Sequence, residues 1–156
     1  MLDEIESLVH WVIGSLKGRP GGQRENHNHR GGSMEYQSQW LKARTKKFAI
    51  QIIKLSQHLP RTDEARILGK QLLRSGTSVA SNYRAACRAR SRKEFVSKIG
   101  IVVEENDETV FWLEMLSDAN ILSEDSIKGL LAEANELLAI FGASQRTAKA
   151  NTRRST

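Results

Sequence analysis

Basic side chains at helical spacing are the residues of this sequence best suited to chemistry, and the chemistry they favour is the binding of phosphate groups. Between Arg61 and Glu94, a helical wheel places five of them within an arc of about 80° on one side. This basic stripe consists of Arg66, Lys70, Arg74, Arg84 and Arg88, and it is followed by Arg90, Arg92 and Lys93. Because lysine and arginine neutralise phosphates, the stripe predicts binding to the backbone of RNA or DNA. Only Tyr83 adds an aromatic ring there, so neither base stacking nor sequence readout is expected.

Catalysis has less support in the sequence. One candidate site is a cluster of carboxylates, which comprises Glu104, Glu105, Asp107 and Glu108. A di-iron site in a bundle also needs Glu-x-x-His motifs, and His58 is the one histidine in the four helices predicted for the bundle. Cys87 has no candidate base, and His27 and His29 lie in a polar loop without a third metal ligand. We therefore expect a protein that is not an enzyme and that has no cofactor or metal.

Charge is distributed unevenly along the chain, although the net charge is only +6. From Pro60 to Lys93 there are nine basic and two acidic residues, whereas from Glu94 to Phe141 there are two basic and eleven acidic ones. In one interpretation, the basic half binds an anionic nucleic acid. In another, basic and acidic helices neutralise one another across a bundle or between subunits. In a third, the chain is a protein-interaction scaffold that recruits an acidic partner protein.

Apolar residues at spacings of three and four predict the helices that must position the basic stripe. The expected helices span about residues 38–58, 62–87, 91–118 and 123–141. Pro60 ends the first, Thr62 and Ser91 are suited to cap the second and third, and Gly142 is expected to stop the fourth. Because strand-like alternation is absent, the predicted fold class is all-α, an antiparallel up-down four-helix bundle.

Composition divides the chain into three segments. Residues 1–33 are expected to form a short amphipathic helix and a flexible linker, residues 34–142 the bundle, and residues 143–156 a disordered basic tail. The first segment is either an appended one, with Met34 as the original start, or a native helix that docks on a partner. A single cysteine, an acidic N-terminus and the lack of an apolar run of about 20 residues predict a cytoplasmic protein without membrane contact.

The predicted third helix carries a second apolar stripe outside its core-facing side. Ile101, Phe111 and Met115 form this stripe, which a monomeric bundle would expose to water. Glu104 and Glu108 lie on the same helix, and their charge complements the basic helix of a neighbouring subunit. These five residues are therefore the predicted contact surface of a homo-oligomer.

Several stretches together resemble a known family. They are QLLRSGTSVASNYRAA, RSRKEF, ENDE and FWLE. Their combination resembles the four-helix-bundle proteins of intervening sequences in bacterial large-subunit ribosomal RNA genes, over about residues 41–141. The resemblance implies a cytoplasmic, ring-shaped homo-oligomer, typically a pentamer, with no established enzymatic activity.

A relative of this family is the accessory variability protein of diversity-generating retroelements, which is similar in its bundle and basic surface. That relative binds nucleic acid and a reverse transcriptase. For this chain the basic stripe, rather than the resemblance, predicts RNA or DNA as a partner, and a nucleic-acid-processing protein is left open as another. The reverse transcriptase does not carry over, because nothing in the sequence points to such an enzyme.

Overall fold

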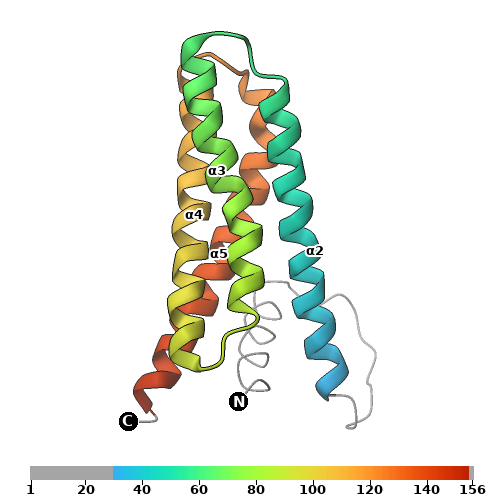
Figure 1. The fold of residues 1–156 in the computed structure, drawn as a ribbon, viewed down its shortest axis with the longest axis vertical. Helices are drawn as coiled ribbons and strands as arrows, with labels where there is room; N and C mark the ends of the chain where they lie inside the picture. Colours follow the sequence, from blue (N-terminus) through green and yellow to red (C-terminus); the bar gives the residue numbers. More distant parts are fainter. Residues whose placement is uncertain (1–29, 155–156) are drawn as a thin grey trace.

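Four long α-helices make up the part of the chain that the structure, a computed structural model, describes: the backbone of residues 30–154, with side chains from residue 38 to residue 150. The helices are α2 (Arg30–Gln57), α3 (Asp63–Ala86), α4 (Arg92–Asp118) and α5 (Glu124–Arg154). They run alternately up and down and are joined by short connections (Figure 1). No strand occurs in residues 30–154, so the predicted all-α class is confirmed for this part. The short helix predicted within residues 1–33 lies outside the described residues. The flexible linker predicted to reach residue 33 is wrong for residues 30–33, because α2 begins at Arg30.

Side-chain caps begin α3 and α4 at the predicted residues. The hydroxyl of Thr62 accepts a hydrogen bond from the backbone N–H of Ala65 at 3.3 Å, and the hydroxyl of Ser91 accepts one from Glu94 at 3.1 Å. These bonds satisfy donors that the first turn of a helix leaves unpaired. The Glu94 carboxylate accepts from the backbone N–H of Arg90 at 2.8 Å, rather than from the N–H of Ser91 as in a standard capping box.

Large apolar side chains from all four helices fill the centre of the molecule. The buried ones include Phe48, Ile52, Leu72, Val79, Phe95, Ile99, Leu113, Leu137 and Phe141. Tyr83 is buried beside Phe141, with 5.3 Å between the ring centroids. These residues occupy the positions at which helical spacing predicts core-facing side chains, so the predicted apolar faces are confirmed.

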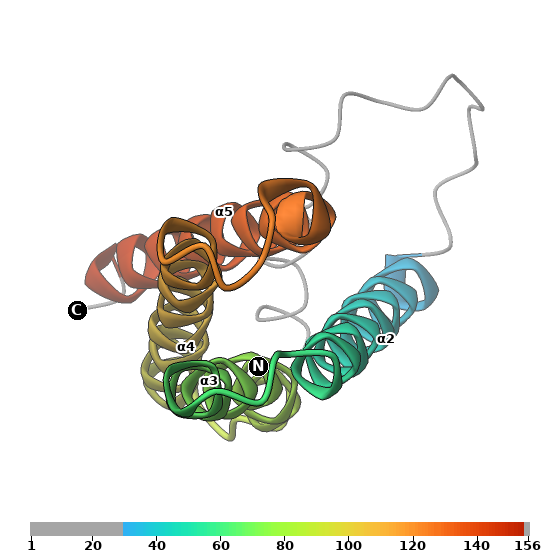
Figure 2. The ribbon, with the colours of Figure 1, turned by 90° about the horizontal axis from the view of Figure 1, so that it is seen from above.

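The helices pack unequally around this core. α3 lies between α2 and α4, and α4 lies between α3 and α5 (Figure 2). α2 and α5 touch over only a small area, where an ion-pair cluster joins them. Arg44 donates two hydrogen bonds to Glu133, at 2.6 and 2.8 Å, and lies 2.8 Å from a carboxylate oxygen of Glu136. We call these three residues the α2–α5 clamp.

Two polar contacts cross the buried interior. The hydroxyls of Thr109 and Ser75 are 3.0 Å apart and join α4 to α3. The side-chain amide of Asn106 donates to the backbone carbonyl of Ala134 at 2.8 Å and joins α4 to α5. All four residues are buried. Because a buried polar group costs free energy unless it is hydrogen-bonded, these contacts favour one register between the helices.

The predicted stop at Gly142 is wrong, and so is the predicted disorder of residues 143–154, because α5 continues to Arg154. Ala148 is fully buried on this extension. This extension packs against the first half of α4. Gly100 of α4 and Gln145 of α5 are so close that a Cβ atom at Gly100 would lie 2.8 Å from the side-chain amide of Gln145. Packing against α4 outweighs the cost of about 1 kcal/mol that a glycine adds within a helix.

Gly76 allows α3 to approach α2 closely. A Cβ atom there would lie 2.9 Å from both γ-carbons of Ile52, whereas one at the exposed Gly129 would have no neighbour within 4 Å. Alanine gains about 1 kcal/mol of helix propensity at either site, but overpacking at Gly76 costs about 1–3 kcal/mol. In urea denaturation, we expect Gly129→Ala to raise the free energy of unfolding and Gly76→Ala to lower it. Changes of the same sign would contradict the close approach.

Candidate nucleic-acid interface

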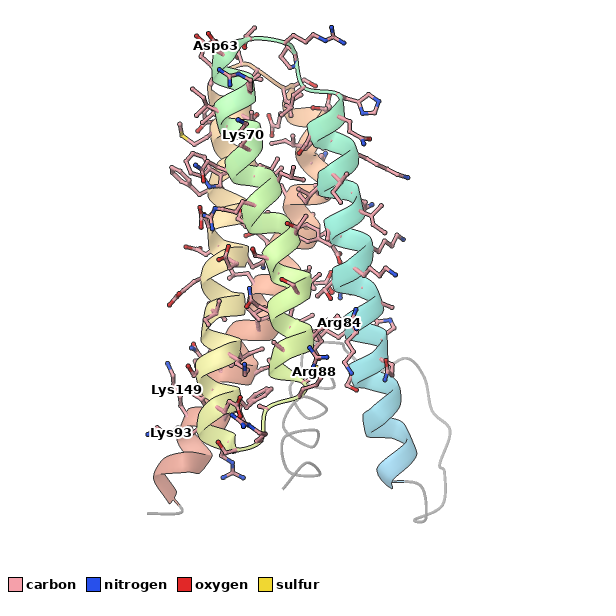
Figure 3. The ribbon with its side chains drawn as sticks, viewed as in Figure 1. Asp63, Lys70, Arg84, Arg88, Lys93 and Lys149 are labelled. Carbon is pink, nitrogen blue, oxygen red and sulfur yellow. The ribbon has the colours of Figure 1, made fainter. Side chains whose placement is uncertain are left out.

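A groove between the lower halves of α2 and α3 gathers four basic side chains. Its volume is about 640 Å³, and its lining residues are Gln39, Lys42, Ala43, Lys46, Thr77, Ala80, Ser81, Arg84 and Arg88. Lys42 and Lys46 come from α2, Arg84 comes from the side of α3 that faces α2, and Arg88 comes from the turn that directly follows α3 (Figure 3). We call this site the lower groove.

Helical spacing places these cations together. Lys42 and Lys46 are four residues apart, so they lie on one side of α2. Arg88 follows Arg84 by four residues in the turn after α3, where its backbone N–H donates to the carbonyl of Ala85 at 3.1 Å. The other lining side chains are mostly small, which leaves space between the two helices. Within residues 38–150, no carboxylate forms an ion pair with any of the four cations. Among the described side chains, the positive charge of the lower groove is therefore not compensated by a carboxylate.

The basic stripe contains only half of this site. Arg84 and Arg88 belong to the stripe, but Lys42 and Lys46 lie on another helix and were not among the predicted binding residues. A signal for them was present, because two lysines four residues apart lie in a helix segment with five basic residues and one acidic residue from Met34 to Leu59. The side of α2 that contacts α3 depends on tertiary packing, so the sequence did not predict that the lysine pair and the arginine pair lie in one groove.

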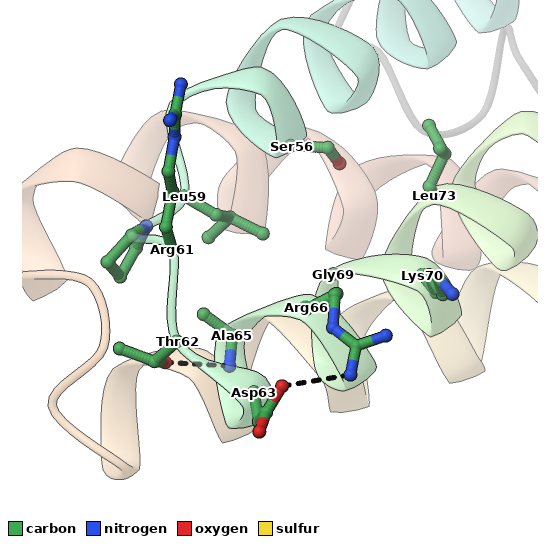
Figure 4. Close-up of a pocket in the computed structure, with 11 residues that line it drawn as sticks. Ser56, Leu59, Arg61, Thr62, Asp63, Ala65, Arg66, Gly69, Lys70 and Leu73 are labelled. Atoms are coloured by element: carbon green, nitrogen blue, oxygen red, sulfur yellow. Dashed lines mark hydrogen bonds and ion pairs between the residues drawn. The ribbon is translucent and has the colours of Figure 1, made fainter.

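Arg66 and Lys70 lie at the other end of α3. There, a pocket of about 360 Å³ is formed at the connection between α2 and α3, and Arg61, Arg66 and Lys70 are among its lining residues (Figure 4). Arg66 forms an ion pair with Asp63 at 2.9 Å, but both side chains are exposed, so the pair contributes little to stability. We call this second cationic site the upper pocket.

Arg74, in the middle of the basic stripe, contacts α4. Its guanidinium forms an ion pair with Glu108 and lies 3.6 Å from Glu105. The indole N–H of Trp112 donates to the same carboxylate of Glu108 at 3.0 Å. The hydrogen bonds from Trp112 and Arg74 lower the pKa of Glu108, and the bond to Glu108 raises the pKa of Arg74. This member of the stripe is thus neutralised by an acidic helix of its own chain.

The basic residues from Arg90 to Lys93 lie away from the lower groove. Arg90 pairs with Glu94 at 3.3 Å, and the hydrogen bond from its backbone N–H lowers the pKa of Glu94. Arg92 is half-buried where α4 begins. Lys93 is exposed and lies, with Lys149, on the opposite side of the view from the groove arginines (Figure 3). The structure does not bring these three predicted binding residues into the lower groove.

Glu105 is a partly buried carboxylate near Arg74, and its burial disfavours the charged form of the side chain. Its side chain is only 18% exposed, and burial raises its pKa, which Arg74 offsets in part. The pKa of Glu105 is higher in the folded protein than in the unfolded chain, so protonated Glu105 stabilises the folded state. This stabilisation is complete below the unfolded-state pKa and is lost as pH rises through the folded-state pKa.

We therefore expect Glu105→Gln to raise the melting temperature at pH 7 and to change it little at about pH 3. The exposed Glu104→Gln is the control, and an equal effect of both changes would contradict the assignment.

The predicted contact surface on α4 is exposed in the single chain. Ile101 is 41% exposed and Phe111 is 49% exposed, whereas Met115 is half-buried. Glu104 is exposed beside them, but Glu108 is occupied by the ion pair to α3. The apolar stripe therefore lies at the surface, as its helical spacing predicts.

The described part of the chain contains neither a membrane-spanning helix nor a cluster of metal ligands. Its helices include none that is long and apolar enough to cross a membrane. Its histidine, cysteine, aspartate and glutamate side chains form no group of three or more that could hold a metal ion. Of the predicted carboxylate cluster, Glu105 and Glu108 contact Arg74.

Comparison with known proteins agrees with the motifs of the sequence. Residues 38–143 match the family model of the 23S rRNA-intervening sequence protein. The chain is also similar to a solved protein of unknown function from the S23 ribosomal protein family of Bacteroides thetaiotaomicron, with 28% identity and a TM-score of 0.65 over 70% of this chain and 97% of that one. No curated protein sequence matches. The match over most of its length shows that the chain belongs to the family of 23S rRNA-intervening sequence proteins.

Proposed function

We propose that this protein is a non-catalytic, cytoplasmic protein that binds the backbone of RNA or DNA through the lower groove, without reading the base sequence. The observation that supports this proposal is the grouping of Lys42, Lys46, Arg84 and Arg88 in one groove between α2 and α3. No carboxylate of the described side chains pairs with them, so their charge is available to an external anion. Positive charge concentrated in a groove attracts a polyanion and raises its rate of association.

The distribution of the four cations suits several phosphates better than one small anion. Each pair spans about 6 Å, so its two members can reach separate phosphates. Lysine and arginine contacts to phosphate supply affinity without sequence information. The small side chains between the two pairs offer no aromatic surface for base recognition. This agrees with the expectation that the protein does not read the base sequence.

A salt titration tests this function directly. Each neutralised phosphate adds about −0.9 to the slope of log affinity against log salt on duplex DNA, and about −0.7 on a single strand. Four contacts therefore predict slopes of about −3.6 and −2.8, respectively. Fluorescence anisotropy with labelled RNA and DNA between about 50 and 200 mM salt measures these slopes. Failure to bind either nucleic acid at the lowest salt would end the proposal.

We also propose that the chain assembles into a ring-shaped homo-oligomer through the outer side of α4, for which the family resemblance favours a pentamer. The exposure of Ile101 and Phe111 supports this, because a neighbouring subunit would remove their apolar surface from water. In the alternative function, the assembly is a scaffold whose basic residues pair with acidic helices of neighbouring subunits or of a partner protein. Light scattering at micromolar concentration should report several chains per particle, and a monomer would contradict the assembly.

A further inference from the structure

Cationic sites stand at both ends of the surface along which α2 and α3 lie side by side. The lower groove occupies one end and the upper pocket occupies the other. In the upper pocket, Arg61 and Lys70 have no ion pair among the described side chains, whereas Arg66 pairs with Asp63, which also lines the pocket. About 21 Å of helix separates Lys70 from Arg84. We call the whole surface, from the upper pocket to the lower groove, the α2–α3 seam.

Aliphatic side chains lie in the middle of this seam. Leu73 lines the upper pocket and is 36% exposed, and Ile53 is 38% exposed. Ile53 lies seven residues after Lys46 and three before Ser56, which line the two sites, so helical spacing places it on the same side of α2. The contact between positions 76 and 52 sets the register of the two helices, and it places Leu73 and Ile53 within about 3 Å of each other along the bundle axis.

We infer that the α2–α3 seam takes an unpaired strand of nucleic acid in preference to a duplex. The inference rests on the proposed function and names the substrate class of the same site. The cations of the lower groove and the upper pocket hold phosphates at two places on the strand. Between them, Leu73 and Ile53 contact the faces of unpaired bases.

The chemistry of the middle of the seam separates the two kinds of nucleic acid. A duplex hides its base faces and carries one phosphate charge per about 1.7 Å of axis, so it would set charged groups against Leu73 and Ile53. Charges placed against aliphatic surface lose hydration without a compensating contact. An unpaired strand exposes base faces, which lose apolar surface to water when they contact aliphatic side chains.

The experiment compares one labelled RNA of unstructured sequence, alone and annealed to its complement, at the same salt concentration by fluorescence anisotropy. The variants are Ile53→Gln and Leu73→Gln, made singly and together, because glutamine keeps helix propensity and length while it removes the apolar end. The matched control is Ile67→Gln, on α3 but outside both cationic sites and 56% exposed. Wild-type protein is expected to bind the single strand about tenfold more tightly than the duplex.

The double variant is expected to lose this preference and to keep its affinity for the duplex, whereas Ile67→Gln should change neither affinity. The salt slope on the single strand should stay the same, because the phosphate contacts remain. Equal or tighter duplex binding by the wild type would overturn the inference, as would an unchanged preference in the variants. A variant that changes the size of the assembly but not strand binding would show that Leu73 and Ile53 contact a second copy of this chain. This result would also overturn the inference. None of these results removes binding that depends on Arg84 and Arg88, so failure of the inference is distinguishable from failure of the proposed function.

Discussion

Replacing Arg84 and Arg88 together by glutamate is expected to reduce affinity for RNA and DNA at least about 100-fold at low salt. The double variant removes two phosphate contacts and places two carboxylates opposite Lys42 and Lys46 in the lower groove. These lysines would then pair within the protein instead of with the backbone. The milder Arg88→Gln should leave measurable binding and reduce the magnitude of the salt slope on a single strand by about 0.7. Anisotropy titrations measure both effects.

The charge-matched control is Lys93→Glu with Lys149→Glu. It changes the net charge by the same amount, but both lysines are exposed on the other side of the view (Figure 3). We expect it to weaken binding only slightly, through the general field of the protein. An equal loss in both double variants would show that net charge, rather than the lower groove, holds the nucleic acid. Size exclusion of the Arg84 and Arg88 variant adds a second readout, since dissociation of the assembly would identify the groove as a contact between subunits.

Arg44→Met is expected to lower the free energy of unfolding by about 3 kcal/mol. The Arg44 side chain is 13% exposed and that of Glu133 is 26% exposed, so the change leaves a largely buried carboxylate without its partner. The change also removes the positive charge that offsets the repulsion between Glu133 and Glu136. In addition, it removes the contact between the guanidinium group and the Trp40 ring, whose centroid lies 5.2 Å from the guanidinium carbon. Because α2 and α5 touch over only a small area elsewhere, few other contacts can compensate. Urea denaturation followed by circular dichroism measures the loss.

Lys47→Met is the matched control for the clamp. Lys47 lies on the same helix, is exposed and has no ion pair among the described side chains, so we expect a change within about 0.5 kcal/mol. Adding Glu133→Gln to Arg44→Met should recover part of the stability, because it removes the unpaired charge. A loss from Arg44→Met no larger than that from Lys47→Met would show that the clamp does not hold α2 against α5.

Sequence alone determined the four helices and the beginnings of α3, α4 and α5, because these depend on local chemistry, whereas α2 begins at Arg30 and not at about residue 38 as predicted. Apolar side chains at spacings of three and four define a core-facing side in any helix, and the observed burial follows that spacing. A hydroxyl at Thr62 or Ser91 satisfies backbone donors only two or three residues away, so its effect can be read without the fold. The end of α5 was not predictable in this way. Gly142 is a local stop signal, but the surface of α4 that overrides it comes from a distant part of the chain.

For the candidate site, too, the sequence determined some features and the tertiary structure decided the others. Sequence determined that Arg66, Lys70, Arg74 and Arg84 lie on one side of a helix, because the periodicity of 3.6 residues per turn is intrinsic to the helix, whereas Arg88 lies in the turn after α3. Only the tertiary structure decided that Lys42 and Lys46 join Arg84 and Arg88 and that Arg74 is neutralised by Glu108. The physical reason is that the facing sides of two helices depend on their rotation and register. These are set by contacts such as the close approach at Gly76, which no periodicity within one helix specifies.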